Sequence, residues 1–102
     1  DYWVHIWFHI PKDNALGKLE KLINKAKNSP QNLAFEEFCW LCERFGMAER
    51  RHAGSHRVYK RMQEPIFALS IQSDKGRAKP YQVKQFLDLL EEHGLFGKEK
   101  EE

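Results

Sequence analysis

The stretch MAERRHAGSHRVYKRMQEPIFALSIQ, residues 47–72, decides the fold class because its apolar residues do not follow helical spacing. β-Branched and aromatic residues come in short runs, around Val58 and over residues 66–71, and Gly54 and Pro65 lie near the breaks between the runs. Short runs of this composition between turn residues are typical of strands. We predict three short antiparallel strands in this stretch.

Helical periodicity surrounds the predicted strands. Residues 16–26 and 35–45 each carry an apolar stripe, the second with Asn32 as the expected N-cap and Gly46 as the expected stop. After the strands, Pro80 marks a first helical position and a further stripe follows. The order predicts a two-layer α+β fold with an extra N-terminal helix, in which helices cover one face of the sheet and leave the other free for a ligand. Either His56 with Val58 or Ser55 with Tyr59 can form the inward face.

Composition indicates one soluble globular domain. The chain has 102 residues, 41% of them hydrophobic, and its mean hydropathy of −0.73 accompanies no apolar run of the roughly 20 residues that a membrane span needs. Residues 2–10 are apolar but lack a basic region and a small-residue cleavage site, so we expect no signal peptide. Only Cys39 and Cys42 are present, which excludes a disulfide framework and favours a cytoplasmic setting.

Charge is concentrated in the middle of the chain. The net charge is +2 overall, but residues 44–84 hold ten Lys and Arg against three Asp and Glu, whereas residues 1–43 hold five against six and residues 85–102 two against six. A concentration of positive charge is expected for a protein that binds a polyanion, most often nucleic acid. An ordinary solvated face would show the same pattern.

Two pairs of residues superficially imitate a zinc site. Cys39 and Cys42 are followed by His52 and His56, but the spacing is shorter than a zinc finger uses and both cysteines belong to an apolar helical stripe. We therefore expect core cysteines, no metal and no other cofactor.

The predicted hairpin around Gly54 combines two histidines with many cations. A neutral imidazole can accept a proton at cellular pH, and neighbouring cations favour the neutral form. Arginine and lysine can bind phosphate and stabilise charge in a phosphorane-like transition state. RNA supplies its own nucleophile, the 2′-hydroxyl, so one base can suffice for metal-independent cleavage. The alternative is a histidine that only binds phosphate or caps the turn.

Three motifs together resemble the HicA toxin family of small bacterial mRNA interferases. A helix like that of residues 35–45 precedes Gly54-Ser55-His56 at the start of a strand, and Lys79-Pro80-Tyr81-Gln82-Val83 opens a final helix that ends at His93-Gly94-Leu95. The similarity covers about residues 33–95. It implies a fold like that of double-stranded-RNA-binding domains, helix, three strands and helix, used to cut mRNA.

The resemblance also implies roles for residues and a partner. His56 matches the catalytic histidine of the family, and a HicB-type antitoxin would cover the active face. Many relatives carry a second histidine where this chain has Arg57, so Lys60, Tyr59 or solvent would have to protonate the leaving 5′-oxygen.

The expected domain layout has three parts. Residues 1–29 form an extension with a helix and with the aromatic residues Trp3, Trp7 and Phe8, residues 30–97 form the HicA-like domain, and residues 98–102 form a charged tail.

The expected function is metal-independent endoribonuclease activity with His56 as general base. The expected RNA-binding residues are Ser55, Arg57, Lys60, Arg61, Arg50, Arg51 and Lys79. Two alternatives remain: a non-catalytic RNA-binding module on the same fold, and an adaptor whose basic face binds an acidic protein.

Overall fold

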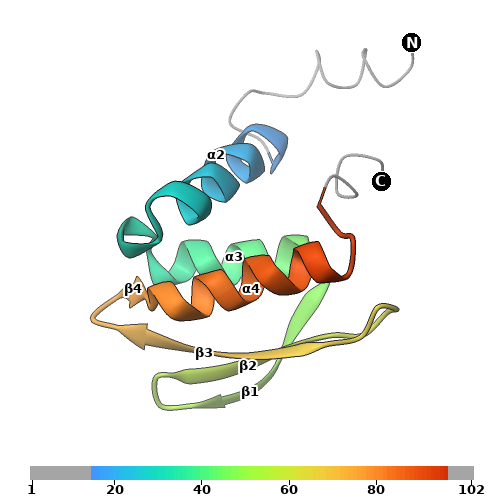
Figure 1. Cartoon of the computed structure of the whole chain (residues 1–102). Coiled ribbons are helices and arrows are strands. Elements are labelled where there is room, and N and C mark those ends of the chain that lie inside the picture. Colours follow the sequence, from blue (N-terminus) through green and yellow to red (C-terminus); the bar gives the residue numbers. More distant parts are fainter. Residues whose placement is uncertain (1–14, 97–102) are drawn as a thin grey trace.

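The computed structural model describes residues 15–96, which form three α-helices and a four-stranded antiparallel sheet (Figure 1). In chain order the elements are α2 (Ala15–Asn28), the 3-10 turn η1 (Pro30–Asn32), α3 (Phe35–Arg44), β1 (Met47–Ala53), β2 (His56–Arg61), β3 (Ala68–Asp74), β4 (Arg77–Ala78) and α4 (Pro80–Glu92). The predicted α+β class is confirmed. The prediction of three strands was one short, because the two residues of β4 follow a tight turn after β3. The predicted extension aromatics Trp3, Trp7 and Phe8 and the charged tail 98–102 lie outside the described residues.

The sheet has the order β1-β2-β3-β4, so consecutive strands are neighbours. Its β4 edge is paired further, because residues 33–35 run beside it: the Phe35 N–H donates to the Gly76 carbonyl and the Ala78 N–H to the Leu33 carbonyl, each at 2.9 Å. On the other side, no described strand pairs with the outer edge of β1. A bulge between Glu49 and Arg51 interrupts the pairing of β1 with β2.

Helices α3 and α4 lie on one face of the sheet, and α2 packs on their outer side (Figure 1). The two-layer expectation therefore omitted a layer. The core joins all three helices and the sheet; its largest fully buried side chains are Tyr59, Phe38, Phe86, Leu33, Leu41, Ile71, Leu90, Val83 and Cys42. Leu19, Leu22 and Ala26 of α2 are buried in this same cluster. The helix assigned by sequence to an extension is thus part of the single core.

The burial of the side chains along β2 shows on which face of the sheet each residue lies. Tyr59 is 1% exposed, and its partner Leu69 on β3 is 2% exposed, so both point toward the helices. Since successive side chains of a strand point to opposite faces, His56, Val58 and Lys60 point away from the helices. We call this second surface the open face; no helix within residues 15–96 packs on it (Figure 1).

Helix α3 begins after an extended stretch of chain and ends at a glycine. At its start the predicted N-cap, Asn32, was wrong: Asn32 ends η1, and Ala34 occupies the N-cap position. The chain between them is extended because Leu33 is buried and its carbonyl bonds to β4. At the C-terminal end, Gly46 adopts φ +87°, which favours glycine, and the chain turns into β1.

Candidate nucleic-acid interface

His56 is the first residue of β2 and lies exposed on the open face, beside the turn that joins β1 to β2. Its partners across the sheet are Ala53 on β1 and Gln72 on β3. Within residues 15–96, no hydrogen bond or ion pair engages its ring. The imidazole is therefore accessible to a ligand lying on the open face.

Residues that pair across the strands form rows on the open face, and the rows next to that of His56 contain two of the predicted cations. Arg51 pairs with Val58 and so lies in the row next to His56, while Lys60 lies one row further along β2. Residues of one strand on the same face are spaced by about 7 Å, so Lys60 is about 13 Å from His56 along the strand. Arg50 sits at the bulge and is exposed. Arg51 is therefore the exposed cation in the row next to His56, and Lys60 lies further along the same face.

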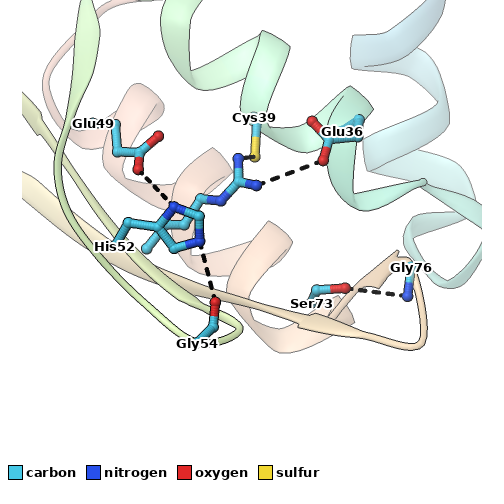
Figure 2. Close-up of polar contacts among 8 residues, drawn as sticks. Glu36, Cys39, Glu49, His52, Gly54, Ser73 and Gly76 are labelled. Carbon is cyan, nitrogen blue, oxygen red and sulfur yellow. Dashed lines mark hydrogen bonds and ion pairs between the residues drawn. The ribbon is translucent and has the colours of Figure 1, made fainter.

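His52, the other histidine of the hairpin, is already engaged. Figure 2 shows its ring between Glu49 and Gly54: Nδ1 lies 3.2 Å from the Glu49 carboxylate, and Nε2 lies 3.2 Å from the Gly54 carbonyl. Both ring nitrogens thus face acceptors, and which of them donates depends on the tautomer. Both ring nitrogens of His52 are therefore directed at groups of the hairpin itself, unlike those of His56.

Arg57 was predicted to bind RNA, but its side chain lies on the helix side of the sheet. Nη1 donates to the Cys39 thiol at 3.5 Å, Nη2 lies 3.7 Å from the Glu36 carboxylate, and the guanidinium lies 5.1 Å from the centroid of the Phe35 ring. Figure 2 shows Glu36 and Cys39 projecting together from α3. With 23% of its side chain exposed, Arg57 fastens β2 to α3.

Arg61 has a similar structural role at the far end of β2. Nη1 donates to the Phe45 carbonyl at the end of α3, and Nη2 donates to the Glu64 carbonyl at 3.3 Å. A helix leaves its last carbonyls without partners, and this guanidinium supplies one. The structure therefore does not bring Arg57 and Arg61 together with the exposed cations of the open face.

Neither protein residue considered as the general acid lies where it could reach a phosphodiester at His56. Tyr59 is buried against the helices, and burial together with its contact to Cys39 raises the pKa of its phenol. Lys60 shares the face of His56, but about 13 Å of strand separates them, and proton transfer needs hydrogen-bond contact. Of the three candidates for protonating the leaving 5′-oxygen, only solvent remains.

The end of the sheet near His56 contains polar residues that sequence reasoning missed. The Gln72 side-chain amide donates to the Ser55 hydroxyl at 3.4 Å, and the Gln72 backbone N–H donates to the Gln82 side-chain oxygen at 2.9 Å. Gln82, only 6% exposed, is the one polar residue buried among the described residues. Gln82 belongs to the motif that opens α4, which was the available signal.

Lys79 occupies the N-cap position of α4 and follows β4 directly. It is half-buried, and the adjacent Ala78 pairs with Ser73. The Ser73 N–H in turn donates to the Ser55 carbonyl at 3.1 Å. These bonds place Lys79 at the same end of the sheet as Ser55 and His56.

The cysteines lie in the core, as predicted. Cys39 is 3% exposed and Cys42 is fully buried, and burial raises the pKa of both thiols. His52 and His56 lie on the exposed hairpin instead. In the part of the chain that the structure describes, no three His, Cys, Asp or Glu side chains gather in an arrangement that could hold a metal ion.

Among residues 15–96, each helix is too short or too polar to cross a lipid bilayer. Comparisons with protein-family models, curated proteins and solved structures found no match to this chain.

Proposed function

We propose that this chain is a metal-independent endoribonuclease of the HicA type that cuts mRNA in the cytoplasm with His56 as its general base. The observation that carries the proposal is the position of His56: an accessible imidazole at the end of the open face, next to exposed cations. His52 lacks this freedom, because both of its ring nitrogens are engaged.

The proposed reaction uses the 2′-hydroxyl of RNA as the nucleophile. The imidazole of His56 removes the hydroxyl proton, the 2′-oxygen attacks the adjacent phosphorus, and the bond from phosphorus to the 5′-oxygen breaks. A water molecule protonates the departing 5′-oxygen. The products are a 2′,3′-cyclic phosphate and a 5′-hydroxyl, and DNA is inert because it lacks the nucleophile.

The proposed RNA contacts follow from the positions of the cations. Arg51 lies in the row beside His56 and would bind the phosphate nearest to it, while Arg50 and Lys60 would bind further along the strand. Ser55 and Lys79 complete the site at the end of the sheet. Arg57 and Arg61 are assigned to the fold, because their guanidinium groups bond to α3 and to neighbouring carbonyls.

Two further features belong to the proposal. The order of α3, the strands and α4 supports a fold like that of double-stranded-RNA-binding domains. The regulatory partner would be a HicB-like antitoxin that places an acidic surface over the open face, where the exposed cations lie.

The decisive experiment is cleavage of a defined RNA by the purified protein in EDTA, beside His56→Ala and His52→Ala. We expect cutting with cyclic-phosphate ends by the unaltered protein and a loss of at least about 100-fold in His56→Ala, the lower range for a general base. His52→Ala should retain cleavage. Equal cleavage by His56→Ala would remove His56 from the reaction.

The second candidate is a non-catalytic RNA-binding module on the same fold. The exposed cations Arg50, Arg51 and Lys60 favour it, because they would bind RNA whether or not His56 acts as a base. Binding without cleavage by both the unaltered protein and His56→Ala would establish this module. Absence of RNA binding at physiological salt would point instead to an acidic protein partner.

A further inference from the structure

Tyr81 is the most exposed of the large hydrophobic side chains in residues 15–96. It is 64% exposed, against 51% for Met62 and 49% for Ile66. Its neighbours on α4, Gln82 and Val83, are buried. The first turn of α4 thus presents one aromatic ring to solvent while anchoring the next two residues in the core.

A chain of hydrogen bonds connects this ring to the turn that carries His56. The Tyr81 hydroxyl accepts from the Gln82 side-chain amide at 3.3 Å, and the Gln82 oxygen accepts from the Gln72 backbone N–H at 2.9 Å. The Gln72 side-chain amide donates to the Ser55 hydroxyl at 3.4 Å. Since Gln72 pairs with His56, the chain joins the start of α4 to the start of β2.

The central member of this chain is held firmly. Gln82 is 6% exposed, and an amide buried to this extent is costly unless its polar atoms find partners. Its two ends bond to Gln72 and Tyr81, so the buried amide fixes the end of β3 relative to the tyrosine hydroxyl. Helix α4, which carries Tyr81 in its first turn, begins at the end of the sheet where β3 leads into β4 (Figure 1).

Proteins bind single-stranded nucleic acid with exposed aromatic rings combined with exposed cations. Each base stacks on an aromatic side chain, while lysine and arginine follow the phosphates. Lys79 precedes Tyr81 by two residues, and Arg51 lies on the open face in the row next to His56. In a duplex the bases are already stacked on one another and are not available to such a ring.

We propose that Tyr81 stacks on a base of single-stranded RNA next to the phosphodiester that His56 attacks. The inference rests on the proposed function and adds a base-binding position at the start of α4. Specificity for single strands over duplexes follows, because an unpaired base is required.

The test uses the His56→Ala protein, so that the RNA stays intact, and three fluorescein-labelled probes: a 12-nucleotide oligoadenylate, the same ribose-phosphate chain without bases, and a 12-base-pair RNA duplex. Binding is measured by fluorescence anisotropy. Tyr81→Ala should weaken oligoadenylate binding by about 5- to 100-fold, the range for one stacked base. Tyr81→Phe should stay within about twofold, because the ring remains.

Two controls separate stacking from other effects. Tyr81→Ala should leave binding of the base-free chain unchanged, and Ile66→Ala, which removes an exposed apolar side chain from the loop between β2 and β3, should change neither probe. Thermal melting should shift by a similar amount in Tyr81→Ala and Tyr81→Phe, because both lose the hydroxyl that accepts from the Gln82 amide, so a loss of binding confined to Tyr81→Ala reports the ring.

The outcomes distinguish this inference from the proposed function. If the His56→Ala protein binds oligoadenylate and Tyr81→Ala binds it equally well, the stacking role is wrong and the proposed function stands. If Tyr81→Ala weakens the base-free chain as much, or if the duplex binds more tightly than the single strand, the stacking role is also wrong. If no probe binds the His56→Ala protein, both proposals fail.

Discussion

At the scale of single residues, Arg61 and Gly46 form one structural unit at the junction of α3 and β1. Gly46 adopts φ +87°, and a Cβ added there would lie 2.5 Å from Nη1 of Arg61. The same Nη1 donates to the Phe45 carbonyl. Glycine is favoured here both by its positive φ and by the space that the guanidinium occupies.

The prediction compares Gly46→Ala with Gly76→Ala. Gly76 has φ +86° and open space around its Cβ position, so it reports only the cost of a side chain in a left-handed conformation, about 1–2 kcal/mol. Gly46→Ala should lose about 1 kcal/mol more of the free energy of unfolding, because Arg61 must move and release its hydrogen bond. Urea denaturation measures both.

A third variant checks the cause of this difference. In an Arg61→Ala background the clash and the hydrogen bond are both absent, so Gly46→Ala and Gly76→Ala should destabilise equally. An excess cost that persists without Arg61 would mean that the guanidinium does not determine the requirement for glycine.

At the scale of elements, Glu37 caps the start of its own helix, α3, and connects α3 to α2. Its carboxylate accepts from the Ala34 N–H at 3.0 Å at the beginning of α3, and it lies 3.2 Å from the ammonium of Lys25 on α2. Burial alone raises the pKa of Glu37, but these contacts outweigh it, and the pKa lies below its ordinary value. The charged carboxylate therefore stabilises the folded state.

The pH dependence of stability tests this role. Because the folded-state pKa of Glu37 is depressed, its contribution is present above the unfolded pKa of about 4.3 and is lost as the pH falls through the folded value. At pH 7, Glu37→Ala should lose about 1 kcal/mol, the usual value for a capping contact. Glu37→Gln keeps an acceptor for Ala34 and should lose less, with its difference from the parent vanishing in acid.

Glu36→Gln is the matched control for this measurement. It removes a carboxylate from the same helical turn without touching the Ala34 hydrogen bond. Its ion pair with Arg57 is long, 3.7 Å, and the Glu36 side chain is 79% exposed, so this pair contributes little. Its effect on the unfolding free energy at pH 7 should be the smallest of the three variants. If the free energies of unfolding of the parent and Glu37→Gln differ by the same amount at pH 7 and at pH 3, the contribution assigned to the charge is contradicted.

The helices and strands were easier to predict from the sequence than the face of the sheet on which each strand residue lies. The apolar stripes and Pro80 correctly indicated the helices, the residue runs indicated β2 and β3, and the third strand expected within residues 47–72 corresponds to β1. The faces depend on strand pairing: alternate residues point to opposite sides, and the bulge between Glu49 and Arg51 shifts the alternation on β1. The sequence therefore could not separate Arg57 from Arg51, although one bonds to α3 and the other is exposed.

At the scale of the whole molecule, this separation divides the five Lys and Arg residues of the hairpin, residues 50–61, into two groups. Arg57 and Arg61 are used within the fold, whereas Arg50, Arg51 and Lys60 are exposed. The net charge calculated from the sequence includes both groups. Only the exposed group can exchange its counterions for RNA phosphates, so the strength and the salt dependence of binding should follow from it.

The salt dependence of RNA binding tests the division, again in the His56→Ala protein. For single strands, log Kobs falls with log[salt] by about 0.7 for each phosphate neutralised. Arg51→Gln should reduce this slope by about 0.7 and leave the unfolding free energy nearly unchanged, because the residue is exposed. Arg57→Gln should keep the slope and lose about 1 kcal/mol of stability with its contacts to α3. A slope that falls equally in both variants, with both proteins folded, would place Arg57 in contact with RNA and contradict the assignment of its guanidinium to the fold.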